Sequence, residues 1–314
     1  MRKIIYSTAI AVMTSNVAQA AEHQHYAVTP NNSNFSISYD YMLMNMSDNL
    51  DGTNKVTDTE IFADGFDMSP QKMTTQTHSV TAAYKVGQRT SISASVPYIQ
   101  KDMDMLMDTG DKMKMKSEGV GDTTIQTNFD VTGDKSVQAY FGLSLPTGAV
   151  DKADDGTRLG YSMQTGTGTY DPSIGMQYSQ SVDGWSYGAG ANATMRFGEN
   201  DQDYRFGNEY GVSAFVGRQM TQAVSASWRV DAKSRGNIGG ADAALDPMMD
   251  PTQDGKMQGG EVVTTSFGLA YSPQQGGLKG STLASEFAVP VYQNLDGPQL
   301  ADDYHFMLSL KKDL

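Results

Sequence analysis

The chain has 314 residues, no cysteine and a formal net charge of −13 at pH 7. Without cysteine it can form neither disulfides nor thiolate metal sites, and it has no residue for a lipid-modified anchor. Its acidic balance disfavours nucleic acid as a partner. After the first twenty residues, no apolar run approaches the roughly 20 residues that a membrane-spanning helix needs.

The first residues have the pattern of a secretory signal peptide. Arg2 and Lys3 form a short basic segment, residues 4–13 are mostly apolar, and Ala18 and Ala20 complete an A-x-A cleavage site. We therefore expect residues 1–20 to be removed on export, residues 21–33 to form a periplasmic tail and residues 34–314 to form the folded domain. Loss of the two basic residues lowers the formal charge of −13 by two, to −15.

Residues 34–49, NFSISYDYMLMNMSDN, alternate in polarity. The apolar positions are Phe35, Ile37, Tyr39, Tyr41 and Leu43. The positions between them change from serine at the start to methionine at the end. A period of two predicts a β-strand with one apolar face.

The same alternation recurs almost to the C-terminus. We expect further strands around residues 80–86, 92–98, 123–131, 137–145, 174–178, 185–197, 210–216, 224–230, 263–271, 283–289 and 304–310. About twelve strands result, an even number as in bacterial single-chain barrels. The apolar faces contain no charge, which would cost about 2–4 kcal/mol at the middle of a bilayer. The pattern predicts an all-β, antiparallel, up-and-down transmembrane β-barrel.

Short and long connections alternate along the chain. The short turns are 87–89, 132–135, 181–184, 218–222 and 272–280, and the long polar connections are 47–72, 101–118, 147–172, 198–207, 236–260 and 293–302. In outer-membrane barrels the short turns face the periplasm and the long loops face outward. We therefore expect a Gram-negative outer-membrane location, with lipid as a partner and both termini in the periplasm. A soluble β-sandwich is the structural alternative, but it does not explain the aromatic residues near strand ends.

Four stretches in order resemble one family of outer-membrane transporters. They are VPY (96–98), GVGDTTIQ (119–126), GLSLPTG (142–148) and GTGTYDPSIGMQYS (166–179). Together they are similar to the family named after a meta-pathway of phenol degradation, from about residue 73 onward. The resemblance implies passive solute passage through a barrel of this size. It also implies that the strand around 304–310 is recognised by the barrel-assembly machinery, although Leu314 replaces the usual closing aromatic residue.

Methionine is unusually abundant, with 20 residues. Two lie in the signal peptide and four, Met176, Met195, Met220 and Met307, lie on strands or a short turn, which leaves 14 in the expected outer loops or at strand tops. Thioether sulfur is a soft ligand that suits Cu(I). We expect a soft-ligand funnel at the extracellular mouth from Met42, Met44, Met46, Met73, Met103, Met105, Met107, Met113 and Met115. Flexible apolar packing of the loops is the alternative. The abundance also resembles that of methionine-rich family members found near copper-handling genes.

The expected mature N-terminus offers a second metal site. The Ala21 amine, two backbone amides and the His23 imidazole are four nitrogens of the kind that Cu(II) prefers in a square plane. A functionless tail is the alternative.

Charged residues at inward positions are expected to line the lumen. They are Asp40, Asp122, Asp130, Arg196, Glu209, Arg229, Asp231 and Glu286. Such charges either close a lumen by ion pairing or set its ion selectivity.

No enzyme signature is present, because His78 and His305 stand without a placed nucleophile and there is no phosphate-binding loop. No cofactor is required. The sequence predicts an outer-membrane channel or transporter with a methionine-rich mouth that handles copper as a bound or transported ion. The alternatives are a passive channel for small aromatic or hydrophobic solutes and a non-conducting surface protein that binds a metal or a partner.

Overall fold

The computed structural model describes residues 34–314, which are mostly β-strand. The expected signal peptide, the tail and the copper site at Ala21 and His23 lie outside the described residues. Among residues 34–314, no helix is long and apolar enough to cross a membrane.

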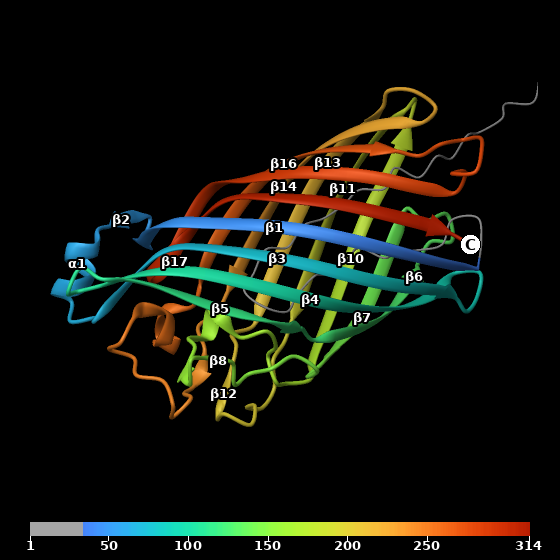
Figure 1. Ribbon diagram of the computed structural model, residues 1–314. Helices are drawn as coiled ribbons and strands as arrows, with labels where there is room; N and C mark the ends of the chain where they lie inside the picture. The colour runs from blue at the N-terminus through green and yellow to red at the C-terminus, as the bar shows by residue number, and fades with distance from the viewer. Residues whose placement is uncertain (1–33) are drawn as a thin grey trace, which may run out of the picture.

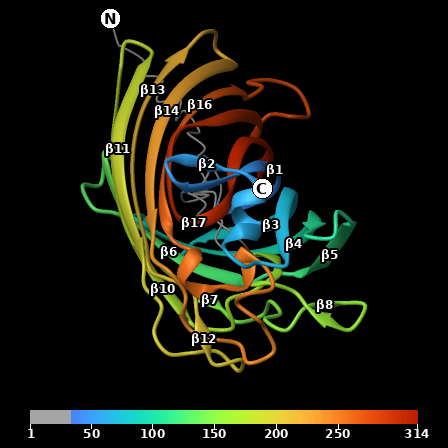
Figure 2. The same ribbon diagram turned by 90° about the vertical axis from the view of Figure 1, so that its left-hand side faces the viewer.

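Eleven antiparallel strand elements form a closed ring (Figures 1 and 2). In ring order they are β1 (Phe35–Gly52), β3 (Met68–Lys85), β4 (Thr90–Met107), β6 (Thr123–Asp130), β7 (Val137–Leu145), β10 (Asp171–Val182), β11 (Trp185–Thr194), β13 (Glu209–Gln219), β14 (Val224–Arg235), β16 (Gly260–Tyr271) and β17 (Ser281–Asp313). The ring is closed by pairing of β17 with β1. The predicted all-β antiparallel barrel is confirmed.

The last element, β17, explains why the ring has eleven elements where the sequence predicted about twelve strands. Its first part pairs with β16 over Leu283–Leu295, and its second part pairs with β1 over Leu295–Asp313. The N–H of Asp313 donates to the carbonyl of Gly280 at 2.9 Å, so the two ends lie together and β17 folds back on itself. Gly297, with φ +125°, allows this tight reversal. The prediction of a long outer loop over 293–302 is therefore wrong. Residues 293–295 pair with β16 and residues 299–302 pair with β1, so only the reversal around Gly297 lies between them.

Three strands of 18 residues, β1, β3 and β4, are much longer than their ring neighbours β6 and β7, which have 8 and 9 residues. Two further strands of the same sheet lie outside the ring: β2 (Asn54–Val56) pairs with β1, and β5 (Lys112–Val120) pairs with β4. We call β1, β3, β4 and β5 the tall wall (Figure 1). The short helix α1 (Asp58–Ala63) follows β2. Most of the expected loops 47–72 and 101–118 is therefore strand.

The alternating pattern places opposite polarities on the two faces of the barrel. On β1, Phe35 and Ile37 are exposed on the outer face, whereas Ser36 and Ser38 are buried inside. Large apolar side chains likewise remain exposed on the outer faces of the other ring strands. A barrel embedded in lipid requires this arrangement.

The apolar outer band ends partway up the tall wall. On β4 the outward positions are apolar through Tyr98, and then become Gln100, Asp102 and Asp104. The inward positions at this level include Met103 and Met105. The upper part of the tall wall therefore extends beyond the apolar band. Buried and exposed residues still alternate there, because one face of the strands packs against protein.

The connections after β7 and β14 fold together at one end of the barrel. Residues 146–170 contain β8 (Ala153–Asp154), β9 (Thr157–Arg158) and the 3-10 turn η1 (Tyr161–Met163). Residues 236–259 contain β15 (Gly239–Gly240), η2 (Pro251–Gln253) and η3 (Gly255–Met257), and β15 pairs with β12 (Tyr204–Arg205). The Tyr161 hydroxyl accepts a hydrogen bond from the N–H of Asp242 at 3.1 Å. We call residues 146–170 and 236–259 the cover (Figure 2).

Candidate functional site

Methionines gather where the tall wall meets the cover. One buried cluster contains Met44, Met46, Met68, Met73, Met103, Met105, Met115, Leu159 and Met163, with Met107, Met113 and Met249 packed against it. Strand register explains this convergence. Met46 faces Met73 between β1 and β3, Met73 faces Met103 between β3 and β4, and Met103 faces Met115 between β4 and β5. A row of thioethers thus crosses four adjacent strands.

The burial of this cluster corrects the expected open funnel. Met73, Met103 and Met105 are only 1–2% exposed. Met103 and Met105 were expected in the long polar connection 101–118, and Met73 at the start of the strand that follows the connection 47–72. In the structure their polar neighbours face outward above the apolar band, and the methionines pack under the cover as a core. Metal binding by these sulfurs stays a prediction. Residues 34–314 contain no group of three or more His, Asp or Glu placed to hold a metal ion.

Lys101 of β4 links the tall wall to the cover by hydrogen bonds. It is 1% exposed, and its ammonium donates to the carbonyls of Ser162 at 2.7 Å and Gln164 at 2.6 Å. The Ser117 hydroxyl of β5 donates to the carbonyl of Met163 at 2.6 Å. A buried ammonium needs such acceptors. Lys101 was not among the expected site residues, because residues 101–118 were expected to form a loop. A signal was present, since Lys101 continues the inward positions of the strand around 92–98.

Asp122 anchors the start and end of the 146–170 segment. Its carboxylate accepts from the N–H of Gly148 at 2.8 Å, and from the N–H and the hydroxyl of Thr167 at 2.7 and 2.8 Å. Beside it, a Cβ on Gly148 would lie 2.6 Å from the Cα of Gly166, so neither glycine has room for a side chain. The motifs 119–126, 142–148 and 166–179 therefore meet at one point, where Asp122 forms hydrogen bonds with the cover.

A buried group of charges lies on the inner faces of β14 and β17. Arg229, 1% exposed, lies 3.2 Å from Asp231 and also pairs with Glu286. All three were expected in the lumen. Their mutual pairing fits the alternative of ion pairs that fill a lumen.

A second buried group joins β10, β11, β13 and β14. Arg196, just after β11, lies 3.4 Å from Asp171 and 3.3 Å from Glu209, and Lys233 also pairs with Glu209. The expected lumen residues Arg196 and Glu209 are thus brought together.

The remaining two expected lumen residues behave differently. Asp40 is buried on the inner face of β1, where it accepts from the Ser38 hydroxyl at 3.1 Å. Asp130 ends β6 and closes the following turn, because its carboxylate accepts from the N–H groups of Gly133 and Lys135 at 2.8 and 3.0 Å. The prediction that Asp130 lines the lumen is therefore wrong, since its side chain stabilises a turn.

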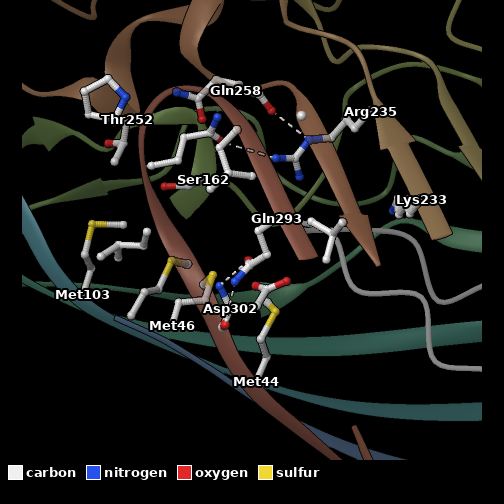
Figure 3. A pocket seen from close by; sticks show the side chains of 17 residues that line it. Met44, Met46, Met103, Ser162, Lys233, Arg235, Thr252, Gln258, Gln293 and Asp302 are labelled. Atoms are coloured by element: carbon white, nitrogen blue, oxygen red, sulfur yellow. Dashed lines mark hydrogen bonds between the residues drawn. The ribbon is translucent and has the colours of Figure 1, made fainter. Parts of the chain in front are cut away.

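A cavity of about 70 Å³ lies between the methionine cluster and the barrel strands opposite (Figure 3). Its apolar lining includes Met44, Met46, Met73 and Met103, and its polar lining includes Lys233, Arg235, Gln258, Gln293, Gln299 and Asp302. Arg235 donates from Nε to the Gln258 carbonyl at 2.7 Å and from Nη2 to Gln299 Oε1 at 3.3 Å. The cavity therefore offers thioethers on one side and fixed hydrogen-bonding groups on the other.

The closed ring and its apolar outer face define a β-barrel of the outer-membrane type. Residues 47–249 match the sequence profile of the family described as "Putative MetA-pathway of phenol degradation", and the chain belongs to this family. No curated protein matches the sequence.

Several solved structures are similar to this barrel, among them an outer membrane channel and an autotransporter β domain. An outer membrane channel from Pseudomonas putida F1 has a TM-score of 0.62 at 13% sequence identity, covering 90% of this chain and 96% of that chain. The β domain of the Bordetella autotransporter BrkA has a TM-score of 0.50 at 10% identity, covering 90% of this chain and 100% of that one. At these identities the likeness concerns the fold.

Proposed function

We propose that this protein is a passive outer-membrane channel for small hydrophobic or aromatic solutes. The observation that carries the proposal is the cavity between the methionine cluster and the polar strands. Thioethers make favourable contacts with aromatic rings, and the arginine and glutamine groups opposite can bind one polar substituent. The family's description, which refers to phenol degradation, supports this class of solute.

The proposal includes an orientation in the membrane. The short turns and both termini face the periplasm, and the tall wall and cover face outward, as in other outer-membrane barrels. The cover then lies across the solute's entry path, so that passage requires it to move. Export with a cleaved signal peptide and insertion by the barrel-assembly machinery complete the expected biogenesis.

Uptake by intact cells tests the proposed solute class. Cells that make the protein should take up radiolabelled phenol several-fold faster than cells of the same strain that lack it, because the channel bypasses the polysaccharide-covered outer leaflet. Uptake of a trisaccharide, which is several times larger than phenol and carries many hydroxyl groups, should be equal in the two strains. Equal phenol uptake, with the protein folded in the outer membrane, would contradict the proposal.

Copper handling is a second candidate, and the row of thioethers favours it. Met46, Met73, Met103 and Met115 face one another in succession across four strands, and thioether sulfur suits Cu(I). Changing these four residues to leucine keeps volume and apolar character but removes the sulfur donors. A copper role predicts that the variant loses Cu(I) affinity against a competing chelator. A packing role predicts unchanged affinity in a variant that still shows heat-modifiable mobility.

A further inference from the structure

His305 of β17 is a buried side chain whose two ring nitrogens both lack a hydrogen-bond partner among residues 34–314. The residue is 2% exposed. Its Nε2 lies 3.7 Å from Oδ2 of Asp302, which is beyond hydrogen-bonding distance. A buried polar group without a partner costs free energy, and a bound ion removes that cost by supplying the partner. The ring nitrogens of His305 are therefore available to a ligand.

The inner face around His305 is lined by methionines. In the β1–β17 register, Met44 faces His305 and Met42 faces Met307. Met307 follows His305 by two residues and therefore lies on the same face of the strand. Met42, Met44 and Met307 are each 2–7% exposed. Directly opposed residues have Cβ atoms about 4.5–5.5 Å apart, a gap that the flexible methionine side chain can span.

We propose that His305, Met42, Met44 and Met307 bind one soft monovalent metal ion, Cu(I) or Ag(I), inside the barrel. Thioether ligands select such ions over Zn²⁺ and Ca²⁺, and imidazole nitrogen is a good ligand for copper. Ligation through a neutral imidazole satisfies a nitrogen that otherwise has no hydrogen-bond partner. The Asp302 carboxylate near His305 adds a negative charge that compensates the positive charge of the ion.

This site adjoins the row of thioethers under the cover, because Met44 belongs to the same buried cluster, but its ligand set is different. It contains a nitrogen ligand, and none of its four residues belongs to the row of Met46, Met73, Met103 and Met115. It also binds metal whether or not the barrel conducts solutes. A negative result for phenol uptake and a negative result for this site are therefore separate outcomes.

Competition titration of the purified full chain with Cu(I), in detergent and without oxygen, tests the site. We expect one ion per chain at this site, and at least a tenfold loss of its affinity in His305→Leu and in Met44→Leu. His78→Leu is the matched control, because its Nδ1 lies 2.7 Å from the Tyr39 hydroxyl on the outer face. Met176→Leu is the control for sulfur, because Met176 is 56% exposed there. Both controls should keep the affinity.

X-ray absorption of the Cu(I)-loaded protein gives a readout that a structural role of His305 would not change. We expect one nitrogen together with two or three sulfurs around copper, and loss of the nitrogen in His305→Gln. His305→Gln also serves if His305→Leu fails to show heat-modifiable mobility. Unchanged affinity in folded His305 variants, or a sulfur-only shell in the wild-type protein, would overturn the site. Loss of binding only in the leucine variant of the row under the cover would assign the metal there instead.

Discussion

Replacing Lys101 with methionine should loosen the cover. Solutes that the wild-type channel excludes should then enter at a rate about tenfold higher, or more. The ammonium of Lys101 bonds the carbonyls of Ser162 and Gln164, which lie in a buried part of the cover. Each buried acceptor left without a partner costs about 1–3 kcal/mol. Since about 1.4 kcal/mol corresponds to tenfold in an equilibrium, the open state should gain at least that factor. Influx of a membrane-impermeant fluorescent dye into proteoliposomes measures the change.

Lys114→Met is the matched control for Lys101→Met. Lys114 lies on β5 with its side chain 54% exposed, and it forms a 3.3 Å surface ion pair with Asp104. Exposed ion pairs of this kind contribute little to stability. Dye influx in this variant should equal that of the wild-type protein. A folded Lys101→Met variant with wild-type influx would show that the cover does not limit entry.

Replacing Arg229 with methionine should lower the free energy of unfolding by about 3–5 kcal/mol or prevent folding. Arg229 is 1% exposed and pairs with Asp231 and Glu286. Its removal leaves two buried carboxylates close together without their shared cation. The midpoint of unfolding in urea, followed by heat-modifiable mobility in detergent, measures the loss.

Neutralising both carboxylates should restore most of that stability. The triple variant Arg229→Met, Asp231→Asn and Glu286→Gln removes the whole charged group, and such replacements are often close to neutral. Arg218→Met is the control, since Arg218 lies near the end of β13 and donates at 2.9 Å to the carbonyl of Asp183 in an exposed turn. It should shift the midpoint only slightly. Equal loss in the single and triple variants would mean that the packing of Arg229, and not its charge, matters.

The barrel could be predicted from the sequence because lipid and interior impose opposite polarities on neighbouring residues. The exposed Phe35 and the buried Ser36 illustrate this rule at the start of β1. The upper strand boundaries were missed for a related reason. Asp102 and Asp104 are polar outward residues and suggested a loop, but above the apolar band an outward residue simply faces water. The alternation of the strand continues at this level, with Lys101 and Met103 as its inward residues.

The cover could not be predicted from local patterns. Lys101 and Ser162 are 61 residues apart in the chain, and Asp122 and Thr167 are 45 apart. Their contacts depend on how a long connection folds back, which strand periodicity does not describe. The place of many methionines in outer loops or at the tops of strands was predicted from the sequence. Their burial was not, because it depends on the cover.

Electrical recording from the purified full chain in a planar lipid bilayer tests the central claim most directly. The barrel with its cover predicts discrete current steps that are sparse in the wild-type protein and more frequent in Lys101→Met, because the cover closes the mouth most of the time. Complete absence of steps in both proteins, with insertion of folded barrels verified, would contradict a channel and favour a non-conducting binding protein.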